Sequence, residues 1–191
     1  YFLHKEGLLS TAAPEGEAEP LTYTYDPADP CPTHGGQNLL LPAGPFDQRK
    51  VSGRPDVLRF ATEPLASPME ITGSVRVRLY VSSDAPDTDF AAKLVDIYPD
   101  GREILMLDNI QRLKFRKGFE KAEPLAPGEV GELSVDLWSI SLIFNKGHRI
   151  GVQISSSNYP RFEKNPNSGD DFPTETNLRK AQNSVYIDKT H

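Results

Sequence analysis

The sequence lacks the short motifs that mark catalytic and nucleotide-binding sites. It contains no Gly-x-Ser-x-Gly elbow, no His-Glu-x-x-His, no Gly-x-x-x-x-Gly-Lys and no Gly-x-Gly-x-x-Gly. The chain therefore lacks the sequence signatures of elbow-type serine hydrolases, zinc peptidases, phosphate-binding NTPases and dinucleotide-binding domains. No nucleophile, base and orienting group can be assembled from recognised motifs, so the residues by themselves indicate no reaction.

Cysteine and long apolar runs are also scarce. Cys31 is the only cysteine, which excludes an intrachain disulfide framework and favours a small packed or surface residue without a chemical role. No apolar run approaches the length of a membrane span, and no basic segment precedes an apolar one, so we expect no membrane partner. The chain begins at Tyr1 and not at a methionine, so we expect residues before it, and the compartment stays unknown.

Positive charge is in deficit. The chain has 21 Lys and Arg against 27 Asp and Glu, a formal net charge of -6, and its basic residues are scattered among acids. A basic stripe that could release counterions from nucleic acid is therefore lacking, and we expect no nucleic-acid partner.

Proline and glycine are plentiful: the 191 residues include 17 Pro and 14 Gly, which suits a turn-rich globular protein. We expect one domain over residues 1–191, with residues 11–20 as an exposed, linker-like segment rich in Ala, Glu, Gly and Pro. Period-2 alternation of apolar and polar residues predicts short strands. After a first strand within residues 1–10, they cover residues 21–25, 57–62, 75–82, 89–98, 103–107, 113–116, 133–137 and 150–154.

Two of these segments have further features. Residues 21–25 end at a proline-rich turn, which is typical of an edge strand. Residues 89–98 are apolar on both sides, as in a strand covered on both faces. Residues 185–187 resemble the start of another strand that stops at His191, so we also expect the chain to continue there. Many short strands and no long helical stripe predict an all-β, mostly antiparallel jelly-roll β-sandwich with long loops.

Several separated motifs then occur in a characteristic order. They are the segments 44–49 (Gly-Pro-Phe-Asp-Gln-Arg), 79–90 with 92–96, the turn 99–101 (Pro-Asp-Gly) and the loop 155–169. Together they resemble the C-terminal domain of the X-Pro dipeptidyl-peptidase and cocaine esterase family of α/β serine hydrolases. The resemblance covers nearly the whole chain and implies a jelly roll of the galactose-binding-like type.

The resemblance also implies a partner and a parent activity. In that family an upstream α/β-hydrolase domain carries the Ser, Asp and His of an acyl-enzyme mechanism, and the parent enzyme cleaves esters, amides or X-Pro dipeptides. None of those catalytic residues lies in this chain, and no family motif assigns a catalytic role to its histidines. The resemblance therefore implies a non-catalytic domain that packs on the catalytic domain, with a possible role at the substrate entrance or in a homo-oligomer contact, and no cofactor.

Asp47, Gln48 and Arg49 are the first candidate site. They could bind a substrate carboxylate, or they could tie the entry loop to a neighbouring surface, which we favour because adjacent residues seldom point the same way on an extended backbone.

Asp84, Asp87 and Asp89 precede Phe90 and could suggest a calcium loop. They lack the Asp-x-Asp-x-Asp-Gly spacing, so we expect carboxylates that order the bend, one of them paired with an arginine, and no metal.

The third candidate site is the loop that contains Tyr159, Arg161, Phe162, Asn165 and Asn167. Tyr159 and Phe162 could stack on a sugar, the alternative function being a carbohydrate-binding module, or they could anchor a rigid interdomain loop. Asn165, Asn167 and Gly169 suit positive φ.

If Arg49 or Arg161 is buried, it would need a carboxylate partner, for which Asp47 and the acids near Asp87 are candidates. Elsewhere, Trp138 is expected to pack in the core or an interface. His148 is expected to be a solvated turn residue.

Overall fold

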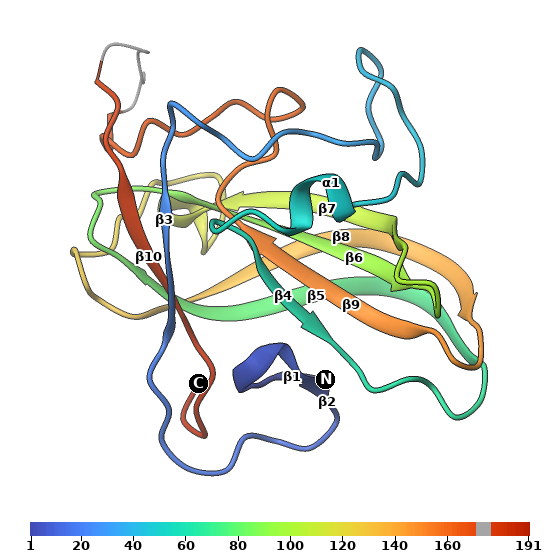
Figure 1. Ribbon diagram of the computed structural model, residues 1–191. Helices are drawn as coiled ribbons and strands as arrows, with labels where there is room; N and C mark the ends of the chain where they lie inside the picture. The colour runs from blue at the N-terminus through green and yellow to red at the C-terminus, as the bar shows by residue number, and fades with distance from the viewer. Residues whose placement is uncertain (171–176) are drawn as a thin grey trace.

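Figure 1 shows the computed structural model, which describes residues 1–170 and 177–191. Two four-stranded antiparallel sheets pack face to face, with strand orders β3-β10-β5-β8 and β4-β9-β6-β7. A two-stranded β1-β2 hairpin lies beside them. The strands are β1 Phe2–Leu3, β2 Leu9–Ser10, β3 Leu21–Tyr25, β4 Leu58–Ala61, β5 Met69–Ser83, β6 Asp89–Ile97, β7 Glu103–Arg112, β8 Gly131–Phe144, β9 Arg149–Ser155 and β10 Ala181–Tyr186. The predicted all-β sandwich is confirmed.

Helical structure is limited to short pieces in the described ranges. These are the 3₁₀ turns η1 Lys5–Gly7 and η2 Leu113–Phe115, and the helix α1 Arg49–Ser52. None is long and apolar enough to span a membrane.

Strand alternation places the core between the two sheets. Leu79 and Val81 of β5 face inward with Leu133 of β8, and they meet Phe90 of β6 and Ile154 of β9. All five side chains are almost completely buried. β6 lies inside its sheet between β9 and β7 and is buried on both faces, as its two apolar sides predict. β3 is an edge strand, again as predicted.

Two expectations about local structure need correction. The segment 113–116, expected as a strand, contains η2 instead. Val185 and Tyr186 lie at the end of β10 and not at the start of a strand, because β10 already begins at Ala181. Its alternation was missed because Gln182, Asn183 and Ser184 give it little apolar character. Residues 11–20 form neither helix nor strand and are mostly exposed.

Long loops cover the outer face of the β4-β9-β6-β7 sheet. Residues 26–57, with α1, and residues 156–170 lie over this sheet and meet through a bridge between Pro32 and Tyr159 (Figure 1). A second bridge joins Asp47 to Ile104 of β7. These loops explain why β6 is buried on its outer side, and they hold most of the candidate site residues.

Candidate docking surface

Gln48 and Arg49 point in opposite directions, as expected for neighbours on the chain. Gln48 is completely buried: its Nε2 donates to the carbonyls of His34 (2.7 Å) and Phe46 (3.0 Å), and its Oε1 accepts from Nζ of Lys93 (2.9 Å). Burial lowers the pKa of Lys93. This partner was not predicted, because lysine side chains are rarely buried and no local pattern links residue 93 to residue 48.

Asp47 forms the structural tie that the sequence favoured. Its carboxylate accepts from Nε of Arg49 (2.8 Å) and from the backbone N–H of Glu103 at the start of β7 (3.1 Å). The hydrogen bond from Arg49 lowers the pKa of Asp47 to about 2. The two charges therefore neutralise each other while they fix the entry loop to the sheet.

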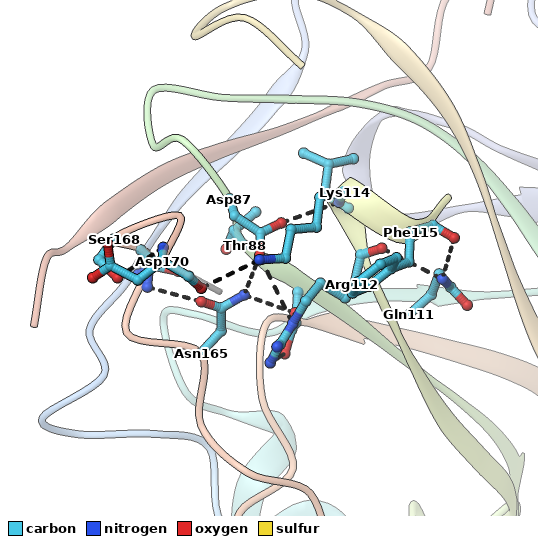
Figure 2. A network of polar contacts seen from close by, with 12 residues as sticks. Asp87, Thr88, Gln111, Arg112, Lys114, Phe115, Asn165, Ser168 and Asp170 are labelled. Atoms are coloured by element: carbon cyan, nitrogen blue, oxygen red, sulfur yellow. Dashed lines mark hydrogen bonds and ion pairs between the residues drawn. The ribbon is translucent and has the colours of Figure 1, made fainter. Parts of the chain in front are cut away.

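Asp87 and Asp89 share one amide group. Nδ2 of Asn165 lies 3.2 Å from Oδ2 of Asp87 and 2.8 Å from Oδ1 of Asp89, and Nε of Arg112 donates to Asp89 at 2.9 Å (Figure 2). The other oxygen of Asp87 accepts from the backbone N–H of Lys114 (3.0 Å). Burial raises the pKa of Asp89. Both carboxylates thus order the bend before the core residue Phe90, and one pairs with an arginine, as predicted.

The same network continues into neighbouring loops. Nζ of Lys114 donates to the carbonyl of Asp170 (3.2 Å), and Nε2 of Gln111 donates to the carbonyl of Phe115 (2.9 Å) (Figure 2). The side chain of Lys114 in η2, just after β7, therefore joins this turn to the loop after β9. Among the residues that the structure describes, no group of three His, Cys, Asp or Glu side chains has a geometry that could hold a metal ion.

Arg161 pairs with a carboxylate that the sequence did not suggest. Its Nη1 lies 2.5 Å from Oδ1 of Asp108 in β7, and both side chains are largely buried. Of the carboxylates expected to pair with Arg49 or Arg161, Asp47 holds Arg49 as expected, and the expectation is wrong for Arg161. Asp87 and Asp89 both lie beside Arg112. The other oxygen of Asp108 accepts from Nδ2 of Asn158 (2.8 Å).

Gly36 lies against this ion pair. A Cβ on Gly36 would meet the Asp108 carboxylate at 3.0 Å and Nη1 of Arg161 at 3.2 Å, and its φ of +87° is strained for other residues. The second glycine of the His34-Gly35-Gly36 sequence is therefore required by a close approach and by backbone conformation.

Tyr159 and Phe162 are half-buried, and each ring is approached by a cation. The guanidinium of Arg161 lies 4.8 Å from the centre of the Phe162 ring, and Nζ of Lys164 lies 5.6 Å from that of Tyr159. The backbone of Tyr159 is hydrogen-bonded to Cys31 and Thr33. The backbone of Tyr159 therefore joins this loop to residues 31–33, and each half-buried ring is in contact with a cation.

Asn167 closes the loop. It is completely buried, has φ of +62°, and donates from Nδ2 to the carbonyl of Arg179 (2.6 Å). Gly169 has φ of +81°. The expected positive φ is thus confirmed for these two residues and wrong for Asn165, whose side chain instead accepts from the backbone N–H of Asn167 (2.9 Å).

A leucine-rich tip projects from the loop between Gly36 and Gly44, and we call residues 39–41 the leucine tip. Leu39 and Leu40 are fully exposed, at 101% and 97% of their reference areas. The tip is nevertheless held: Gly36 and Gly44 exchange two backbone hydrogen bonds, and Oδ1 of Asn38 accepts from the N–H of Leu41 (2.8 Å). Three consecutive leucines before Pro42 are a visible signal in the sequence, but only their exposure in the fold distinguishes them from core residues.

Trp138 lies outside the core, and His148 differs from expectation. Trp138 is 65% exposed at a β-bulge, with φ of +72°, which excludes packing in the core and leaves packing in an interface as the expectation. His148 is buried, and its Nδ1 lies 2.9 Å from Asp96, so it is not solvated. Within residues 1–170 and 177–191, no Ser, Thr or Cys side chain is hydrogen-bonded to a histidine ring, so the His148–Asp96 pair has no nucleophile beside it.

Residues 2–191 match the family described as the X-Pro dipeptidyl-peptidase C-terminal non-catalytic domain. The chain belongs to this family. Cocaine esterase from Rhodococcus sp. (strain MB1 Bresler) is 47% identical over 165 residues, which cover 85% of this chain and 29% of that protein.

Two solved structures of longer proteins contain the same fold. An aminopeptidase from a marine sediment Thaumarchaeota archaeon matches with a TM-score of 0.90 and 30% identity, and an α-amino acid ester hydrolase with 0.89 and 31%. Each match covers 99% of this chain and 34% of the other chain. This X-Pro dipeptidyl-peptidase C-terminal domain therefore spans about a third of the length of the relatives that it matches.

Proposed function

We propose that this chain is the non-catalytic C-terminal β-sandwich of a serine hydrolase that cleaves esters, amides or X-Pro dipeptides. It packs on the upstream α/β-hydrolase domain of the same polypeptide and supplies no residue of the catalytic triad. Two observations support this proposal: the family assignment, and relatives that are about three times longer and whose names include an esterase, an ester hydrolase and an aminopeptidase.

The leucine tip carries the docking part of the proposal. Burial of a leucine side chain contributes about 1.5–3 kcal/mol, so two fully exposed leucines forgo a large stabilisation in the isolated domain. The tip is already ordered by Asn38 and the two glycines, so docking costs little additional conformational entropy. An apolar, preorganised projection of this kind fits an apolar recess on a neighbouring domain.

The surroundings of the tip favour a place at the substrate entrance. The rings of His34 and Phe46 contact each other edge to face, with centroids 5.3 Å apart, at the base of the same loop. Together with Asp47, Arg49 and Lys50 they line a shallow hollow. Leucine and aromatic side chains at the rim of a hydrolase site would exclude water and contact the apolar part of an acyl substrate.

Hydrolysis of activated acyl esters and X-Pro chromogenic amides tests this function. We expect no turnover by this chain alone, and a gain in activity when it is added to the separately expressed upstream hydrolase domain. Turnover by the highly purified chain alone would contradict a non-catalytic role. No turnover by this chain alone and no gain in activity on mixing would contradict the packing role. That result would favour the carbohydrate-binding alternative, which predicts measurable sugar affinity.

In the full-length enzyme, Leu40→Ser tests the entrance role. We expect KM to rise several-fold for substrates with bulky acyl groups, with a smaller change for acetyl esters. Ile143→Ser is the matched control, because Ile143 is also an exposed apolar residue (56%) but lies on β8 of the other sheet. Equal effects of the two variants on KM would show that the leucine tip does not line the substrate entrance.

A further inference from the structure

Strand β5 has a long backbone edge that no described strand covers. β8 pairs with β5 from Met69 to Val81, whereas β10 pairs only with the last part, from Tyr80 to Ser83. On the β10 side, the backbone of residues 69–79 therefore has no strand partner within residues 1–170 and 177–191. Such an edge presents a row of N–H and C=O groups to any extended segment that can reach it.

An apolar groove of about 420 Å³ runs along this edge. Its walls come from both sheets: Ile71, Val75 and Val77 of β5 on one side, and Leu94 and Val152 of the opposite sheet on the other. The three β5 side chains are only partly buried, although their alternation directs them toward the core. The sandwich is thus incompletely filled where the edge is uncovered.

The β1-β2 hairpin does not close the gap. It pairs only with itself, and it contributes Leu3 and Leu9 to the wall of the groove. Tyr1 reaches β5 through one side-chain contact, from its hydroxyl to Sδ of Met69 (3.4 Å). No backbone ladder between the hairpin and β5 is present in the described residues.

We propose that a β-strand from the parent polypeptide, outside residues 1–191, pairs with the edge of β5 between Met69 and Leu79 and fills this groove. The occupant belongs to the same polypeptide because relatives of this chain are about three times its length, which leaves ample additional sequence. Its inward side chains are apolar, to fill the space against Val75 and Val77. Its outward side chains face solvent beside Arg76 and Arg78, which are exposed and already lie 3.5 and 3.4 Å from Asp136 and Glu132 of β8.

The direction of the added strand follows from β10. β10 is antiparallel to β5 and leaves it at Tyr80, and the ring of His191 lies 5.3 Å from that of Tyr80. His191 therefore lies close to the end of the uncovered edge that is nearest to Tyr80. A strand that continues in the direction of β10 is also antiparallel to β5. Both strands on this side of β5 then run in the same direction.

Hydrogen–deuterium exchange of the full-length protein tests the proposal. In an antiparallel pair only alternate amides bond to the neighbour, so an edge strand leaves about half of its amides to exchange quickly. We expect nearly all amides in a peptide within residues 70–78 to be slow, like those of Tyr80 and Val81, which are paired with both β8 and β10. Fast exchange of about half of them would overturn the proposal.

Two further measurements identify the occupant. Protection that falls on tenfold dilution would show that a second copy covers the edge, and would also overturn the proposal. Val77→Gln, which faces the groove, is expected to restore fast exchange, whereas Arg78→Gln, which faces outward, is expected to leave protection unchanged. Equal protection in both variants would count against filling of the groove. These readouts are independent of hydrolysis, so their failure leaves the proposed function standing.

Discussion

Gln48 and Lys93, separated by 45 positions in the sequence, form a buried hydrogen bond that fixes the entry loop on the sheet. The amide also holds two backbone carbonyls of that loop. One side chain thus supplies an acceptor for a buried ammonium and two donors for backbone, which is why it is completely buried.

Gln48→Leu is therefore expected to destabilise the domain by about 2–3 kcal/mol, because it leaves the Lys93 ammonium and two carbonyls without a partner. Urea unfolding measures the effect. Gln37→Leu is the matched control, because Gln37 is exposed in the same loop and should change stability by less than about 0.5 kcal/mol. Equal unfolding midpoints for the two variants would show that the buried amide is unimportant.

Arg161→Ala is expected to cost about 3 kcal/mol, because it leaves the carboxylate of Asp108 buried without its ion-pair partner. Lys164→Ala, in the same loop, should cost less than about 1 kcal/mol, because its ring contact with Tyr159 is partly exposed. Thermal unfolding of both variants checks the order. Equal melting temperatures would contradict it.

Asn165→Ala removes the donor shared by Asp87 and Asp89 and the acceptor for the N–H of Asn167. We expect a loss of about 1–3 kcal/mol and faster proteolysis within residues 159–170. Asn145→Ala, in an exposed turn, is the control of the same residue type. If limited proteolysis cuts both variants at the wild-type rate, the shared amide does not hold the loop.

The acid sensitivity of the entry loop depends on Asp47. Its folded-state pKa of about 2 lies below the ordinary value of 3.8, so its contribution to stability is present above about pH 4 and is lost as the pH falls toward 2. Asp47→Asn should therefore lower the melting temperature at pH 6 but flatten its decline between pH 4 and 2. Glu120→Gln, at an exposed position, should retain the wild-type slope. A wild-type slope in Asp47→Asn would contradict the tie.

The sandwich could be predicted from the sequence because alternation and turn residues are local signals. β6 was predicted almost to its ends, since apolar residues on both of its sides identify a covered strand. β10 was missed because it buries a polar residue, Asn183, whose Nδ2 donates to Thr88 and Ser156, which are distant in sequence. No local pattern reports such partners.

The candidate sites show the same difference between contacts that are local in the sequence and contacts that only the fold creates. The Asp47–Arg49 tie and the turn role of Asp87 and Asp89 were accessible, because neighbouring residues carry them. The partner of Arg161 was not, since Asp108 lies on a strand whose register only the fold sets. The leucine tip was overlooked because apolar residues in a loop gain meaning only once they are seen to be uncovered.

The most direct test of the account is hydroxyl-radical footprinting of Leu39 and Leu40 in the full-length protein and in this chain alone. We expect strong oxidation of both leucines in the isolated chain, where they are fully exposed, and oxidation at least several-fold weaker in the full-length protein. Equal oxidation in the two proteins would contradict docking through the leucine tip.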